Sequence, residues 1–146
     1  MYGYTLVNGT DVQSANNEPA VLQSQLQPIL GPTVTVQNRG VGGSTCAQWL
    51  YGTGNPSITQ SWAAEMAQST AQIVAMNCGI NDAYQPGLST SDWNYMYSQF
   101  AAIANQYGKT FVVMTPNPIN NPHNANFWSL VNDEKYVARQ LGCPDR

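Results

Sequence analysis

The stretch that decides the fold is Ile73-Val74-Ala75-Met76-Asn77-Cys78-Gly79-Ile80-Asn81-Asp82. It opens with four consecutive apolar residues, which is typical of a short strand covered on both faces in a parallel sheet. The residues that follow contain glycine, asparagine and aspartate, and they predict a loop at the carboxyl end of this strand. Ligands of parallel α/β sheets bind beyond the carboxyl ends of the strands. We therefore expect residues 79–82 to form a ligand-binding loop.

Helix and strand signals alternate on both sides of this stretch and predict a mostly parallel sheet covered by helices. The expected elements are a loop over 3–9, a helix from the Asn17 cap to Gly31, a strand over 33–37, a short helix through Trp49 and Leu50, helices over 57–66, from the Ser91 cap to Gly108 and over 127–141, and strands over 73–76 and 111–114. There is no repeat and no linker, and 146 residues fit one domain. We expect a single α/β domain over residues 1–146.

Charged residues make up only 9% of the chain, against about 25% in typical domains. The net charge is −3, and five Lys and Arg residues in total would not neutralise a run of phosphates, so no nucleic-acid partner is expected. No apolar run approaches the roughly 20 residues of a membrane span. The polar, charge-poor composition fits an extracellular or virus-particle protein.

Three cysteines are present, at Cys46, Cys78 and Cys143. An odd number is a poor disulfide framework, and the spacing fits no zinc pattern, so no metal is expected. Cys46 and Cys78 lie just beyond two expected strand ends, which predicts that they are close in space. The residues leave open whether they are small buried thiols or a disulfide.

Three loops combine glycine with a hydroxyl or an amide, at 3–9, 39–45 and 79–82. Backbone N–H groups and an Asn side chain can stabilise negative charge on a carbonyl oxygen, and a hydroxyl beside them is a candidate nucleophile.

Other interpretations of these loops remain open. The glycines of 39–45 suit a tight turn or an anion-binding nest. Asn81 is a candidate cap of the following turn, and Asp82 is expected to order that loop. No phosphate-loop or dinucleotide fingerprint is present, so no cofactor is expected. The four tryptophans are read as core residues in preference to sugar platforms.

Three blocks of the chain, in order, are Tyr2-Gly3-Tyr4-Thr5-Leu6-Val7-Asn8-Gly9, Asn38-Arg39-Gly40-Val41-Gly42-Gly43-Ser44-Thr45 and Gly79-Ile80-Asn81-Asp82. They resemble the first three sequence blocks of the SGNH (GDSL) hydrolases. The resemblance implies a flavodoxin-like three-layer α/β/α sandwich that hydrolyses acyl or acetyl esters, carbohydrate esters among them. It places Thr5 at the nucleophile position and implies that the N–H groups of Thr5 and Gly43 and the side-chain amide of Asn81 are the oxyanion donors.

The chain departs from the family pattern in three places. Tyr4-Thr5 stands where the family has Asp-Ser, and the extra methyl group of Thr5 restricts its side chain. The Asp-x-x-His block that supplies the base is absent, and His123 is either a substitute base or an ordinary loop histidine. The family's first strand is almost missing, so the fold is expected to be incomplete at both ends. A partner chain or segment would then complete the sheet, unless the topology closes up or the chain is a fragment.

Three functional hypotheses follow. The first is an SGNH-type ester hydrolase with a small acyl-ester or glycan-ester substrate and weak or no activity as the isolated chain. The alternative is a catalytically inactive SGNH-like domain that binds a ligand or serves as a structural part of a larger assembly. An unrelated flavodoxin-like binding protein is the third interpretation.

Overall fold

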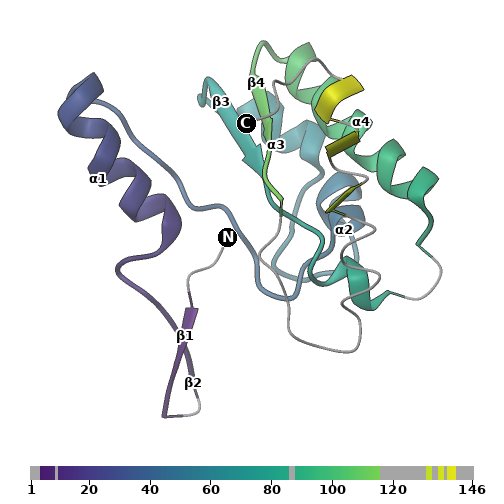
Figure 1. Cartoon of the computed structure of the whole chain (residues 1–146), viewed down its shortest axis with the longest axis horizontal. Helices are drawn as coiled ribbons and strands as arrows, with labels where there is room; N and C mark the ends of the chain where they lie inside the picture. The colour runs from purple at the N-terminus through teal and green to yellow at the C-terminus, as the bar shows by residue number, and fades with distance from the viewer. Residues whose placement is uncertain are drawn as a thin grey trace. The chain divides into compact units, whose positions relative to one another are not determined.

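The computed structural model describes residues 4–8, 10–85, 88–115, 131–132, 135–136 and 138–140. The chain divides into two compact units, Met1–Gly42 and Gly43–Arg146. The elements of each unit are labelled in Figure 1. Helices and a parallel strand pair both occur, so the chain is of the mixed α/β class.

The first unit begins with an antiparallel hairpin of β1 (Tyr4–Val7) and β2 (Thr10–Gln13), drawn in purple in Figure 1. The loop expected over 3–9 is therefore wrong for residues 4–7, which form a strand. The dipeptide Asn8-Gly9 separates the two strands, and Asn8 has a φ of +52°. Asn-Gly is the strongest short hairpin signal because the favoured two-residue turn needs positive φ. This signal could have predicted the hairpin.

Helix α1 (Glu18–Leu30) confirms both of its expected ends. The Asn17 side chain accepts a hydrogen bond from the N–H of Ala20 at 3.2 Å. Gly31 follows the last turn with a φ of +104°. Both features are local to the helix ends, which is why the sequence predicts them well.

The strand expected over 33–37 is wrong. These residues bond to side chains of α1 instead of to a neighbouring strand. The Gln27 side-chain amide donates to the Val34 carbonyl at 3.0 Å, and the Val36 N–H donates to Gln23 Oε1 at 2.8 Å. Because a strand needs the backbone of a partner strand, β-branched residues alone do not make one.

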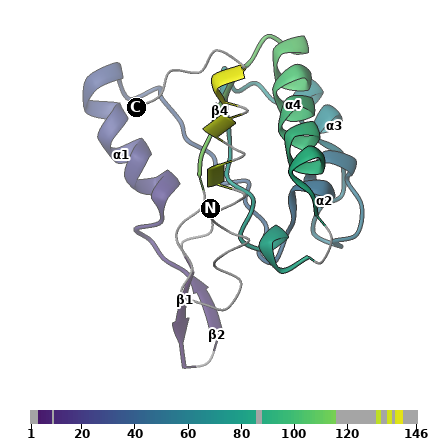
Figure 2. The ribbon, with the colours of Figure 1, turned by 45° about the vertical axis from the view of Figure 1, so that its right-hand side comes forward.

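The second unit contains α2 (Cys46–Tyr51), α3 (Trp62–Gln68), β3 (Ile73–Met76), the short 3₁₀ helix η1 (Asp82–Tyr84), α4 (Thr90–Gln106) and β4 (Thr110–Val113). β3 and β4 pair in parallel, with Ile73 opposite Thr110 and Met76 opposite Val113. The strand at 73–76 is confirmed, and the strand expected at 111–114 begins one residue earlier. Figure 2 shows α2, α3 and α4 on the same side of this strand pair.

The strand pair is covered on one face in the part of the chain that the structure describes. Val74 and Met76 are buried, whereas Ile73 is 65% exposed and Ala75 is exposed. Coverage of the second face of β3 stays a prediction. A four-residue apolar run does not distinguish one covered face from two.

Helix α4 supplies the centre of the core. Its buried residues recur at the spacing of one helical face: Trp93, Met96, Tyr97, Phe100 and Ala104. Trp62 of α3 packs edge-on against Phe100 with ring centroids 5.2 Å apart, and its indole N–H donates to the Phe100 carbonyl at 3.0 Å. This contact joins α3 to α4.

Two helix starts differ from expectation. The cap of α4 is Ser89, which forms a capping box with Asp92, and not Ser91. Helix α3 begins at Trp62 after the Ser61 cap, and not at Ser57. Two serines lie near the start of each helix, so propensity alone does not select the one whose hydroxyl meets the helical N–H groups. The described residues between 131 and 140 are helical, as expected.

Candidate functional site

The second and third blocks meet at the carboxyl end of β3. The Asn81 side-chain amide donates a hydrogen bond to the Ser44 carbonyl at 2.9 Å, over a separation of 37 residues. Asn81 precedes η1 but makes no side-chain bond to its backbone, so the expectation that it caps that turn is wrong. The amide therefore joins two loops, and it places Asn81 beside the residue that follows Gly43.

Gly43 has a φ of +69°, in the left-handed region that favours glycine. An added Cβ would meet no described atom within 4 Å, so backbone conformation requires the glycine and close packing does not. This backbone conformation suits a tight turn, and the anion-binding interpretation stays a prediction. Gly43 is exposed, so its backbone borders solvent.

The loop after Gly43 is anchored to α2. The indole N–H of Trp49 donates to the Ser44 hydroxyl oxygen at 3.0 Å. Thr45 caps α2 and forms a capping box with Gln48. Ser44, whose carbonyl accepts from Asn81, is thus attached to α2 through Trp49.

Thr5 belongs to the first unit. It lies in β1, where it pairs with Val12 of β2. His123, Trp128 and Cys143 lie outside the described residues. Trp62 and Trp93 are buried in the core, as expected, and Trp49 is half-buried against it.

Cys46 and Cys78 form a disulfide with a Cα–Cα distance of 5.4 Å. The two residues are 0% and 7% exposed, respectively. The predicted proximity is confirmed, and the choice that the sequence left open is decided in favour of a bond. Cys46 is the first residue of α2 and Cys78 follows β3, so the disulfide joins the same two segments as Asn81 does.

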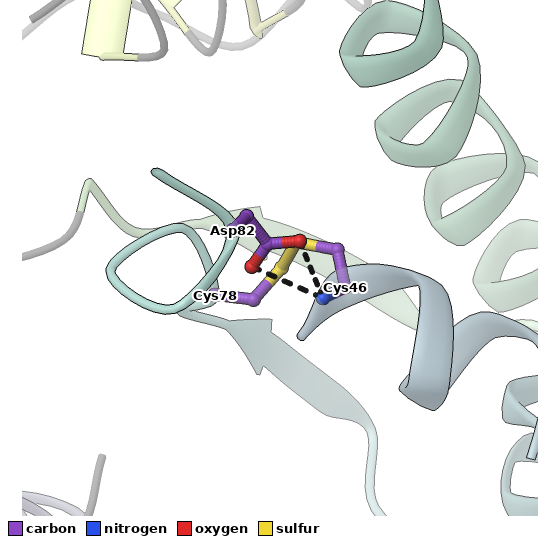
Figure 3. Close-up of side chains that lie close together, drawn as sticks. All are labelled: Cys46, Cys78 and Asp82. Carbon is purple, nitrogen blue, oxygen red and sulfur yellow. Dashed lines mark hydrogen bonds between the residues drawn. A yellow bond between two sulfur atoms is a disulfide. The ribbon is translucent and has the colours of Figure 1, made fainter. Parts of the chain in front are cut away.

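Asp82 lies against this disulfide and is 1% exposed. Its two carboxylate oxygens accept the N–H of Cys46 at 2.9 and 3.2 Å (Figure 3). Burial raises the pKa of Asp82 from 3.8 to about 6, while backbone hydrogen bonds from Cys46, Asp82 itself and Gly79 act in the opposite direction. The carboxylate reaches beyond its own loop to the N-terminus of α2, which favours negative charge.

Sequence reasoning expected Asp82 to order its own loop but did not find the partner on α2. Asp82 and Cys46 are 36 residues apart, and no local pattern connects them. The Tyr97 hydroxyl completes the surroundings of the disulfide, since it donates to the Cys78 carbonyl at 3.4 Å and lies 3.6 Å from the Cys78 sulfur.

Comparisons of the chain with models of protein families, with curated proteins and with solved structures found no match. Among the described residues, no helix combines the length and the apolar character needed to cross a membrane.

Proposed function

We propose that the chain is an ester hydrolase of the SGNH type, with a small acyl or acetyl ester, including a carbohydrate ester, as substrate. The observation that supports this function is the hydrogen bond from the Asn81 amide to the Ser44 carbonyl, directly after Gly43. It brings together the loops of two of the three resembling blocks. They lie at the carboxyl end of a parallel strand, where α/β proteins bind ligands.

In this proposal β3, β4 and helices α2 to α4 are part of a flavodoxin-like three-layer sandwich. The Gly43 N–H and the Asn81 amide donate to the oxygen on which negative charge develops when the ester carbonyl is attacked. A side-chain amide carries two N–H groups. The bond to Ser44 uses one of them, and the proposal assigns the other to the substrate oxygen.

Thr5 is the proposed nucleophile. Its Oγ1 forms a bond to the ester carbonyl carbon and its proton passes to a base, which gives the proton to the departing alcohol when the tetrahedral intermediate collapses. Water then attacks the acyl-enzyme, the acid is released, and the Thr5 hydroxyl regains its proton. The Cys46–Cys78 disulfide supports an oxidising compartment as the place of action, which agrees with an extracellular or virus-particle protein.

Hydrolysis of p-nitrophenyl acetate tests the proposal in the wild type and in Asn81→Ala, Thr5→Ala and Thr5→Ser. We expect Asn81→Ala to lower kcat by about 10²- to 10³-fold, the usual effect of losing one oxyanion donor. Thr5→Ala should abolish turnover, and Thr5→Ser should raise it because the crowding methyl group is removed. Asn105→Ala, on the exposed surface of α4, is the matched control and should leave kcat unchanged.

An equal background rate in the wild type and in all of these variants would contradict the hydrolase. It would favour the alternative, an inactive SGNH-like domain that binds a ligand or supports a larger assembly. The replacement of the family's Asp-Ser by Tyr4-Thr5 is the observation that favours this alternative.

A further inference from the structure

Three potential metal ligands from separate segments meet in the interior of the second unit. Cys46 comes from the start of α2, Cys78 from the loop after β3, and Asp82 from η1. Their two sulfurs and a carboxylate oxygen all lie within 4.8 Å of one another, and all three residues are buried. Figure 3 shows the carboxylate directed at the first residue of α2, beside the disulfide.

We propose that reduction of the Cys46–Cys78 disulfide turns this cluster into a three-ligand site for a thiophilic divalent cation, with Zn²⁺ as the cation that fits the donor set best. Two thiolates and a carboxylate are ordinary zinc ligands. With Zn–S bonds of about 2.3 Å and Zn–O bonds of about 2.1 Å, ligand atoms at tetrahedral corners lie roughly 3.6–3.8 Å apart. The ligand atoms already lie within 4.8 Å of one another, and after reduction the two sulfurs must move apart from bonding distance to reach this geometry.

The three ligands have anchors other than the disulfide. The N–H of Cys46 is held by the Asp82 carboxylate, and the Cys78 carbonyl accepts from the Tyr97 hydroxyl. The bond between Asn81 and Ser44 joins the same two loops one residue before Asp82. These bonds do not involve the sulfur atoms, so reduction leaves them in place. The cluster is therefore expected to stay assembled when the sulfurs separate.

The electron and proton balance is simple. A dithiol reductant transfers two electrons and two protons to the disulfide, which yields the Cys46 and Cys78 thiols, and the reductant becomes a disulfide itself. Zn²⁺ then forms bonds to both sulfurs and to one Asp82 oxygen, and the two thiol protons pass to solvent. The segments before α2 and after β3 are thus joined by a covalent bond in an oxidising compartment and by a metal in a reducing one.

The spacing of the cysteines predicts no metal site, and the proposal does not depend on that spacing. It rests on Asp82, whose proximity to the cysteines is a property of the tertiary structure. The proposal is also independent of ester hydrolysis, because its test reads metal binding.

Titration with Co²⁺ tests the proposal, since thiolate ligation of Co²⁺ produces charge-transfer absorption. The titration compares the oxidised protein with protein reduced by a phosphine, which competes for the metal less than a dithiol does. A Cys143→Ser background leaves Cys46 and Cys78 as the only cysteines. We expect the reduced protein to bind one Co²⁺ with release of about two protons. Zn²⁺ should then displace the Co²⁺ without further proton release, and the oxidised protein should bind neither metal.

Variants identify the ligands. Loss of an outer-shell partner lowers metal affinity by about 10- to 100-fold, so we expect Asp82→Asn, which removes a ligand, to lower it by about 100-fold or more. Asp92→Asn removes an exposed carboxylate of α4 and should leave the affinity unchanged. Circular dichroism of the reduced protein reports its helix content with and without Zn²⁺.

Several results would overturn the proposal. One is a reduced protein without charge-transfer absorption, and another is an Asp82→Asn variant that binds Co²⁺ as tightly as the wild type. If reduction unfolds the helices, Zn²⁺ must restore them, and a failure to do so also counts against the site. If the reduced wild type binds Co²⁺ and the Cys143→Ser variant does not, the metal is bound at another site and the proposal fails.

Discussion

The pH dependence of stability reports on Asp82, the buried carboxyl at the N-terminus of α2. Its pKa is raised to about 6 by burial, from an ordinary value of 3.8. The folded state therefore binds the proton more tightly than the unfolded state does. Between pH 3.8 and about 6 the folded state carries more protons, so the free energy of unfolding falls as the pH rises through this window.

The size of the effect follows from the same two pKa values. Each unit of pKa difference corresponds to about 1.4 kcal/mol, which gives about 3 kcal/mol over the whole window. This stabilisation is present when Asp82 is protonated, below pH 3.8, and is lost above about pH 6. Ionised Asp82 is thus expected to weaken the fold at neutral pH relative to a neutral side chain in the same place.

Asp82→Asn supplies such a neutral side chain. The amide oxygen can still accept the N–H of Cys46, but the group does not ionise. The added NH₂ group needs an acceptor, and a buried donor without one costs about 1–3 kcal/mol, so the absolute stability of the variant is a poor readout. The difference in unfolding free energy, variant minus wild type, should instead increase by about 3 kcal/mol as the pH rises across the window.

Urea unfolding followed by tryptophan fluorescence at several pH values, with the disulfide intact, measures this difference. Asp92→Asn is the matched control, because Asp92 is exposed and its pKa is lowered by hydrogen bonds from the Ser89 hydroxyl and N–H. Asp92 contributes stability above its unfolded pKa of 3.8 and loses it as the pH falls, so its sign is opposite. Parallel curves for Asp82→Asn and the wild type would refute the burial argument.

Three further predictions concern the second unit. Replacing Cys46 and Cys78 together by alanine should lower the unfolding free energy by about 4 kcal/mol, because the disulfide closes a loop with a sequence separation of 32 and so restricts the unfolded chain. Denaturant titration of this variant and of the oxidised wild type measures the difference. Phe100→Ala should cost about 3–5 kcal/mol because the side chain is fully buried, and a melting temperature equal to that of the wild type would contradict the packing. Gly52→Ala should destabilise more than Gly43→Ala in the same thermal assay: both have positive φ, but a Cβ at Gly52 would collide with backbone at the start of α3, whereas Gly43 faces open space.

Local structure could be predicted from the sequence where its causes lie within a few residues. The cap and stop of α1, at Asn17 and Gly31, and the buried face of α4 illustrate this. Each depends on one hydrogen bond near a helix end or on a repeat along one helix face. The hairpin before α1 has a local cause of the same kind, the Asn8-Gly9 dipeptide, although the resemblance of the block around Thr5 to a catalytic loop predicts no strand there.

The sequence by itself thus determined the α/β class, the short strand at 73–76 and the loop at its carboxyl end that holds Asn81. Only the tertiary structure decided that residues 33–37 bond to α1 and form no strand, and that Val74 and Met76 are the buried residues of β3. It also decided that Cys46, Cys78 and Asp82 form one buried cluster. These contacts join residues up to 36 positions apart, so they depend on how α2 packs against the loop after β3, and no pattern within either segment encodes that packing.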